Sequence, residues 1–399
     1  MASSTSFKNV KTHGSDTLQV TILASEWGFH YEGLSTMNRE LAIQLAAFSC
    51  VEVTFFLIKC SAEDKNAADR HGITILQAVR RPGVVDELEW LSYPPDNLQI
   101  DVVVGHGVKL GHQAQFIRKS HKCKWVQFVH TDPEERGIFK RDRNSISIGE
   151  QQHKTEIELC QMADFVVGVG SKIAEHFRSC LHFCGKDVFD FTPGVFVDFA
   201  TIQLSPYVRN HDKVLLFGQG DVEDFELEGF HIAARSIAHF HNIQVLFVGA
   251  PDGQCDQIVE RFANCGIPSN RIRVRGCLNL ESLKQVFCEV DLVLMPSRTE
   301  GFGFGLVALS VGLPVIVSKN SGFGEALSRI HFGSSWVIDS EDPPVWTAAI
   351  NGIWNKDIRL RLEEAKFVRD LYSKRYAWSE QCKDLLEQMF KLVNGRNCI

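Results

Sequence analysis

Long apolar runs and an excess of basic residues are both absent from this 399-residue sequence. No run approaches the roughly 18 apolar residues of a membrane-spanning helix, so no transmembrane segment is predicted. The stretch Met1–Asp16 is polar and Ser/Thr-rich without an apolar core, which predicts a disordered tail over residues 1–16 and no signal peptide. Lys and Arg number 42 against 49 Asp and Glu, and this acidic balance argues against nucleic acid as a partner.

Cys-x-x-Cys pairs are absent as well, although the chain has 12 cysteines. Scattered cysteines without a secretion signal predict reduced thiols and a cytoplasmic location. One local cluster combines His176, Cys180, His182 and Cys184. Zinc uses such donors, but no second ligand pair accompanies them, so we interpret them as packed or exposed side chains and predict no metal site.

Short apolar runs alternate with helix-like stretches along the chain. Such alternation predicts an α/β protein with doubly wound parallel sheets. A helix is expected from about Ser35, whose hydroxyl would cap it, because Met37, Leu41 and Leu45 recur at helical spacing. The strands expected are Leu18–Ser25, Val51–Leu57, Asp101–Val104, Trp125–Val129, Phe165–Val169, Lys213–Gly220, Val245–Val248, Ile272–Arg275 and Leu292–Met295.

A break in this alternation divides the chain. Thr192-Pro193-Gly194 and the polar residues after it interrupt the pattern, which restarts at Lys213. We therefore predict two Rossmann-like domains, at residues 17–195 and 196–375, followed by a C-terminal helix at 376–399.

The most informative segment is Asp291–Ala326, which reads as a buried strand, a glycine-rich acidic loop, a short helix, a second strand and a second glycine loop. The first loop lies where open α/β sheets bind ligands, beyond the carboxyl ends of the strands. Gly301, Gly303 and Gly305 allow backbone amides to approach a ligand closely, and Glu300 can accept hydrogen bonds from hydroxyls. A polyhydroxylated anionic ligand fits such a loop; an ordinary glycine-rich turn is the alternative.

This segment resembles the donor-sugar motif of the GT-B glycosyltransferases of family 4, the group 1 glycosyl transferases, and the resemblance extends over about Leu18–Glu387. It implies two domains that face a cleft, the first for the acceptor and the second for a nucleotide-sugar donor, and a final helix that braces the first domain. It also implies a retaining, metal-independent transfer without a cofactor, from a nucleotide sugar to a glycan or small-molecule acceptor.

The resemblance carries over to individual residues. His130 matches the histidine at the reacting centre, where a neutral imidazole can hydrogen-bond a sugar hydroxyl; a histidine that caps a strand end is the alternative. His106 is a weaker candidate of the same kind. Glu300 is the second residue expected to take part in catalysis, together with His130. The residues expected at the donor sugar or phosphate are Gly33, Gly218, Gln219, Glu228, Gly301, Phe302, Gly303 and Arg298.

The chain departs from the family where cations are usual. Gln219 and Glu228 stand where an Arg and a Lys are expected, and Val307 or Ala308 replaces the second glutamate. Hydrogen bonds to charged groups are worth about 1.5–3 kcal/mol each, so we expect weak binding of the donor diphosphate and slow transfer. Arg298, Lys319 or Arg235 are alternative sources of charge. Two functions stay open: a weak retaining glycosyltransferase, or an inactive relative that senses or scaffolds a sugar nucleotide or glycan. An epimerase of the same fold is a third, without specific support.

We predict that Glu300→Gln leaves folding nearly unchanged while sugar-dependent binding or turnover falls, because a carboxylate accepts stronger hydrogen bonds than a neutral amide. The measurements are the melting temperature, the thermal shift with nucleotide sugars, and turnover. A variant equal to the parent in all three would show that Glu300 is only a loop residue.

Overall fold

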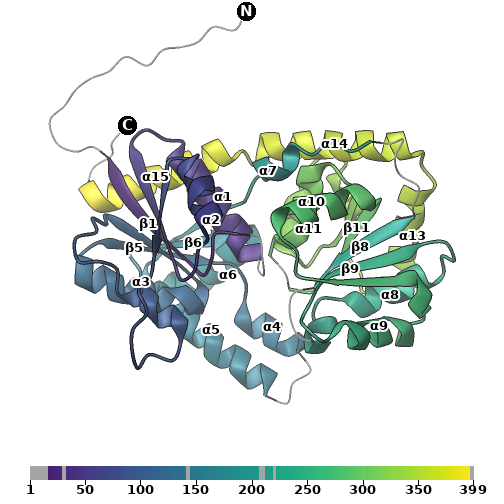
Figure 1. Ribbon diagram of the computed structural model, residues 1–399, viewed down its shortest axis with the longest axis horizontal. Coiled ribbons are helices and arrows are strands. Elements are labelled where there is room, and N and C mark those ends of the chain that lie inside the picture. Colours follow the sequence, from purple (N-terminus) through teal and green to yellow (C-terminus); the bar gives the residue numbers. More distant parts are fainter. Residues whose placement is uncertain are drawn as a thin grey trace, which may run out of the picture.

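The computed structural model describes residues 17–28, 33–140, 144–205, 212–218, 222–299 and 301–395. It contains two α/β halves that lie side by side, each built on a parallel sheet (Figure 1). The strand orders are β3-β2-β1-β4-β5-β6-β7 and β10-β9-β8-β11-β12-β13. In both sheets the order reverses at the first strand, between β1 and β4 and between β8 and β11. The predicted doubly wound α/β architecture is confirmed.

The first half contains β1 (Leu18–Ala24), α1 (Gly33–Ala46), β2 (Val51–Leu57), α2 (Ala62–Asp69), β3 (Ile73–Gln77), the 3-10 helix η1 (Glu87–Ser92), β4 (Val102–His106), α3 (Gly107–His121), β5 (Lys124–Val129), α4 (Pro133–Phe139), α5 (Ser145–Met162), β6 (Phe165–Val169), α6 (Ser171–Leu181), η2 (His182–Cys184) and β7 (Val188–Phe191).

The second half contains α7 (Val197–Ala200), β8 (Lys213–Phe217), η3 (Val222–Phe225), α8 (Phe230–Ala238), β9 (Gln244–Ala250), α9 (Cys255–Asn264), η4 (Ser269–Arg271), β10 (Ile272–Gly276), α10 (Leu280–Glu289), β11 (Leu292–Met295), α11 (Gly303–Val311), β12 (Val315–Ser318), α12 (Gly322–Ser328), η5 (Gly333–Trp336), β13 (Val337–Ile338), α13 (Pro343–Trp354) and α14 (Ile358–Arg375). The last helix, α15 (Trp378–Asn394), lies over the first half (Figure 1).

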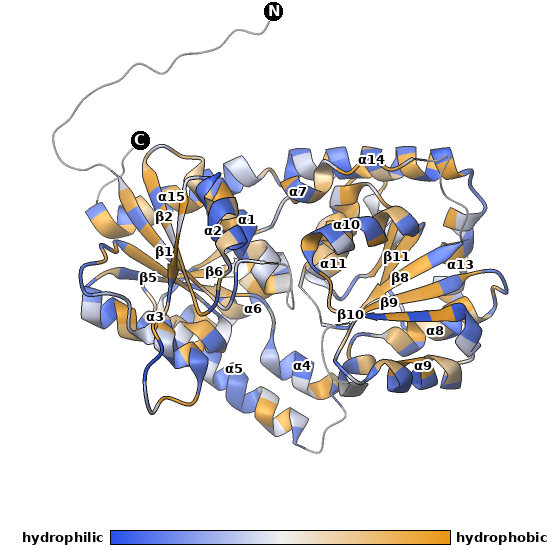
Figure 2. Ribbon diagram, viewed as in Figure 1, coloured by the Kyte–Doolittle hydropathy of each residue, from blue (hydrophilic) through white to orange (hydrophobic). Residues whose placement is uncertain are grey.

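Apolar strands form the interior of each half, and the surrounding helices alternate polar and apolar faces (Figure 2). Strands β2, β6 and β11 have the predicted bounds, because most of their residues are apolar and buried. The helix expected from Ser35 begins earlier, at Gly33, so the prediction that Ser35 caps it is wrong: its side chain is buried within the first turn.

Two passages of the chain connect the halves, and they pack against each other. The first is the segment after β7, and the second lies between α14, which contacts α11, and α15, which contacts α1. The hydroxyl of Tyr372 donates to the carbonyl of Pro193 (3.0 Å), and Nε1 of Trp378 donates to the carbonyl of Val195 (3.0 Å). A Cβ on Gly194 would lie 2.3 Å from the carbonyl oxygen of Tyr376. The exact domain limits stay predictions.

No helix in the described segments combines the length and apolar character needed to cross a membrane.

We predict that Gly194→Ala destabilises the protein by about 1–3 kcal/mol, because the new methyl group overlaps backbone that cannot move without separating the two passages. Gly352→Ala is the matched control: it lies in α13 with nothing within 4 Å of its added Cβ, and it should stabilise by up to about 1 kcal/mol. Urea unfolding measures both. Equal effects of the two substitutions would contradict the prediction.

Candidate functional site

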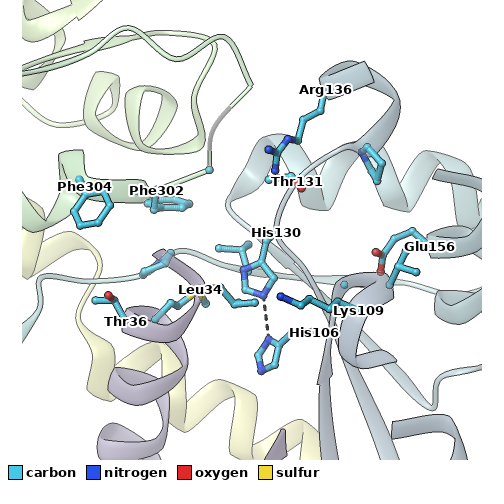
Figure 3. A pocket seen from close by; sticks show the side chains of 18 of the residues that line it. Leu34, Thr36, His106, Lys109, His130, Thr131, Arg136, Glu156, Phe302 and Phe304 are labelled. Carbon is cyan, nitrogen blue, oxygen red and sulfur yellow. Dashed lines mark hydrogen bonds between the residues drawn. The ribbon is translucent and has the colours of Figure 1, made fainter. Parts of the chain in front are cut away.

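A cavity of about 780 Å³ lies between the halves, at the carboxyl ends of strands from both sheets (Figure 3). Its position agrees with the rule that ligands bind where the strand order of an open sheet reverses, and its size suits a small molecule. The first half contributes the start of α1, the β4–α3 junction and the end of β5; the second contributes the loop before α11. Lining residues include Leu34, Thr36, His106, Lys109, His130, Arg136, Glu156, Phe302 and Phe304.

The two histidines predicted at strand ends form a pair in this cavity. Nδ1 of His106 lies 3.0 Å from Nε2 of His130, within hydrogen-bonding distance (Figure 3). Burial lowers the pKa of His130 to about 4 and drives the pKa of His106 well below its usual value. Both rings are therefore neutral at pH 7, and one donates its proton to the other. A neutral His130 suits hydrogen bonding to a hydroxyl better than attraction of an anion.

Glu156 was missed by sequence reasoning because it lies on the long helix α5. Its Oε1 accepts a hydrogen bond from Nε2 of Gln127 at 2.9 Å, and burial raises the pKa of its carboxyl to about 7. The group thus exchanges a proton near neutral pH inside the cavity. A signal was present: the buried face of α5 repeats at helical spacing, through Ser145, Gly149, His153, Glu156 and Cys160.

Two cations were also missed, and both come from the first half. Lys109, in the first turn of α3, points its amino group toward His130, and Arg136 projects from α4 on the other side of the cavity (Figure 3). The sequence had suggested three other sources of charge, and none of them lines the cavity. Arg298 pairs with Glu341, Lys319 pairs with Asp339, and Arg235 is exposed on α8.

Two helices begin at the cavity: α1 at Gly33 and α11 at Gly303. Unpaired backbone amides and the helix dipole favour an anion at such N-termini. Gly301 and Phe302 precede α11 and line the cavity, and Gly303 has a positive φ of 37°. The structure thus brings four of the predicted donor residues to two helix starts that face a common space.

The ring of Phe302, in the second half, packs against the start of α6 in the first half. A Cβ on Gly170, at the start of α6, would lie 2.8 Å from Phe302 Cε2, and one on Gly322 would lie 3.1 Å from the same atom. A Cβ on Gly301 would lie 3.2 Å from the carbonyl oxygen of His130. The loop before α11 is therefore held directly against the end of β5.

Gly218 and Glu228, two further residues predicted at the donor, do not line the main cavity. Gly218, at the end of β8, is packed under Phe247, where a Cβ would come within 2.2 Å of the ring. Glu228 lines a smaller pocket; burial raises the pKa of its carboxyl to about 7, and the charge of Arg136 opposes that rise. Gln219 and Glu300 lie outside the described residues. The roles assigned to all of them stay predictions.

Helix α4 belongs to the first half but contacts the second. Lys140, after its last turn, pairs with Asp224 of η3 at 2.9 Å, and the Arg298 guanidinium lies 4.7 Å from the Phe139 ring centroid. The carboxylate of Glu325, in the second half, accepts a hydrogen bond from the backbone N–H of Lys172 in α6 at 2.9 Å, and Nζ of Lys172 pairs with Glu135 of α4 at 2.8 Å. Contacts between the halves thus gather beside α4 and the start of α6.

Comparison with known proteins gives consistent matches. The sequence model of a family described as "Family 4 Glycosyltransferase in conflict systems" matches residues 21–385. The chain is 26% identical over 382 residues to a D-inositol 3-phosphate glycosyltransferase of Corynebacterium urealyticum, covering 90% of this chain and 78% of the relative. Sucrose-phosphate synthase of Thermosynechococcus elongatus superposes with a TM-score of 0.72 at 17% identity, over 95% of this chain and 100% of that one. HepE of Anabaena, in complex with UDP and glucose, gives a TM-score of 0.68 at 15% identity, over 93% and 99%. The two sheets and these likenesses show the GT-B fold.

The raised pKa of Glu156 predicts a pH-dependent stability. Its carboxyl titrates near 4.5 when unconstrained and near 7 in the fold, so the native state holds the proton more tightly. Stability should therefore fall as the pH rises from about 4.5 through about 7, by on the order of 3 kcal/mol.

Glu156→Gln cannot ionise, so its urea midpoint should change less than the parent's between about pH 5 and pH 8. Glu150→Gln, at an exposed position of the same helix, is the control and should keep the parental slope. Identical slopes for Glu156→Gln and the parent would contradict the assignment.

Proposed function

The chain belongs to the family 4 glycosyltransferases of conflict systems, and from that membership we propose that it transfers a sugar from a nucleotide sugar to a hydroxyl acceptor in the cavity of Figure 3. The observation that carries the proposal is the convergence of the α1 and α11 N-termini with His130 on one cavity. In the reaction, the bond between the anomeric carbon and the diphosphate oxygen breaks, and a bond to the acceptor oxygen forms. The acceptor proton leaves with the departing phosphate, and the new bond forms on the same face of the sugar.

The donor diphosphate would lie between the two helix N-termini. Their amides and the charges of Arg136 and Lys109 would stabilise the departing nucleoside diphosphate, in place of the cations that Gln219 and Glu228 do not supply. The raised pKa of Glu228, about 7, would let its carboxyl take up a proton near neutral pH and so lessen its repulsion of a diphosphate. The complex of HepE with UDP-glucose supports a nucleotide sugar as the donor.

The sugar and acceptor would occupy the space beside the histidine pair. Neutral His130 would hydrogen-bond a sugar hydroxyl, and Glu300 would accept hydrogen bonds from other hydroxyls of the donor sugar. Lys109 and the proton-exchanging Glu156 would face the acceptor, a glycan or a small polyhydroxylated molecule. The name of the Corynebacterium relative makes D-inositol 3-phosphate a rational member of an acceptor panel.

A second candidate function, binding without turnover, is supported by α11. Val307 and Ala308 are both buried and apolar, so this helix offers no carboxylate where the family places its second glutamate. The same cavity would then recognise a sugar nucleotide or glycan and report its presence to a partner.

We predict that a panel of nucleoside diphosphates and nucleotide sugars contains a ligand that raises the melting temperature, and that Arg136→Gln weakens its binding about 10- to 100-fold. Loss of one hydrogen bond to a charged group, about 1.5–3 kcal/mol, sets this range. Arg235→Gln, an exposed arginine outside the cavity, should bind as the parent does.

Turnover with the bound donor, read as free nucleoside diphosphate and as the anomeric configuration of the product, separates the two functions. Retention supports the transferase, and inversion would contradict the proposed stereochemistry. Binding without turnover for any donor and acceptor would favour the second candidate. No ligand from the panel, or equal loss in both arginine variants, would overturn the assignment of the cavity.

A further inference from the structure

A cluster of metal-ligand side chains lies beside the cavity, where α4, α5 and α6 meet. Donor atoms of His153, His176 and Cys180 all lie within 4.8 Å of one another. His176 and Cys180 are four residues apart on α6 and so share one helix face, while His153 comes from the buried face of α5. In the sequence, His176 and Cys180 had no second pair of ligands nearby. The fold brings His153, 23 residues before His176, next to them.

Asp132, the N-cap of α4, supplies a carboxylate to the same cluster. Its Oδ1 lies 3.0 Å from Nδ1 of His153, and its Oδ2 lies 3.4 Å from Nε2 of His176. The same nitrogen of His176 lies 3.7 Å from Sγ of Cys180. One carboxylate, two imidazoles and one thiol thus converge from three helices.

These separations are close to those of a tetrahedral site. Metal–nitrogen bonds of about 2.0 Å and metal–sulfur bonds of about 2.3 Å place neighbouring donors roughly 3.2–3.7 Å apart. The Asp132–His176 and His176–Cys180 distances fall in that range, the Asp132–His153 distance of 3.0 Å is slightly shorter, and the donor atoms of His153, His176 and Cys180 all lie within 4.8 Å of one another. Small side-chain rotations would close the set around one ion.

Hydrogen bonding alone accounts poorly for this arrangement. Nδ1 of His153 is buried and makes no well-aligned hydrogen bond to any described residue, although the Asp132 carboxylate is 3.0 Å away. The thiol of Cys180 is at most a weak partner for His176. A metal ion would instead satisfy these atoms together. The His176 side chain is 38% exposed, which leaves a path for the ion from solvent.

We propose that Asp132, His153, His176 and Cys180 form a zinc-class metal site that fastens α4 to α5 and α6. Borderline-soft Zn²⁺ matches the mixed sulfur, nitrogen and oxygen donors and the four-coordinate geometry. The thiol proton passes to solvent as the sulfur–metal bond forms. Because Asp132 lies two residues after His130 and opens the helix that carries Arg136, the ion would set the position of one wall of the cavity.

The first test uses the unmodified full-length chain, stripped with a chelator and titrated with Zn²⁺ or Co²⁺. One equivalent should bind, raise the melting temperature, and with Co²⁺ give a thiolate-to-cobalt charge-transfer band and the intense visible bands of a tetrahedral ion. Zn²⁺ should also protect Cys180, and not Cys184, from alkylation, as read by peptide mass spectrometry. Alkylation of Cys180 at the same rate with and without Zn²⁺ would overturn the proposal.

The second test uses variants with controls from the same stretch of sequence. Cys180→Ser and His153→Gln should each weaken Zn²⁺ binding by more than about a hundredfold, and Asp132→Asn, which keeps a capping side chain, by about 10- to 100-fold. His182→Gln and Cys184→Ser replace exposed neighbours outside the cluster and should bind as the parent does. Equal binding by ligand and control variants would refute the site, whether or not the protein transfers a sugar.

Discussion

The close backbone contact between the two interdomain passages is the constraint on which the rest of the structure depends. Gly194 lies so near the carbonyl of Tyr376 that no side chain fits between them, and Tyr372 and Trp378 donate hydrogen bonds to the same segment. This contact fixes how the two sheets face each other. Only with the sheets so placed do the end of β5 and the start of α11 meet at a single cavity.

The strands that are most buried were the ones that could be predicted from the sequence. Strands β2, β6 and β11 are mostly apolar, and their bounds could be read directly from the sequence. Strands β3, β7 and β13 were not predicted, because they are short or partly exposed and so lack an apolar run that marks them. The helix start at Gly33 was misplaced because Ser35 has the chemistry of a cap, whereas its side chain is buried in the first turn.

The candidate site was predictable only where its residues directly follow strands. His106, His130 and the glycines before α11 do so, and their convergence followed from the rule for strand ends. Lys109, Arg136 and Glu156 lie on helices, where a charged residue normally faces solvent, and only the packing of α3, α4 and α5 around the cavity turns them inward. Arg298 and Lys319, which we expected to replace the missing cations, do not line the cavity, because they pair with nearby carboxylates.

The contacts between the two halves differ in how much their separation would cost. On the α4 flank, the pair Lys140–Asp224 is partly exposed to solvent, and such pairs contribute only about 0–1 kcal/mol. At the interdomain passages, buried aromatic rings and a glycine contact resist separation. We therefore expect any rotation between the halves to disturb the exposed contact of α4 with η3 before the backbone contact at Gly194. Such a rotation would widen the cavity beside α4, the helix that carries Arg136.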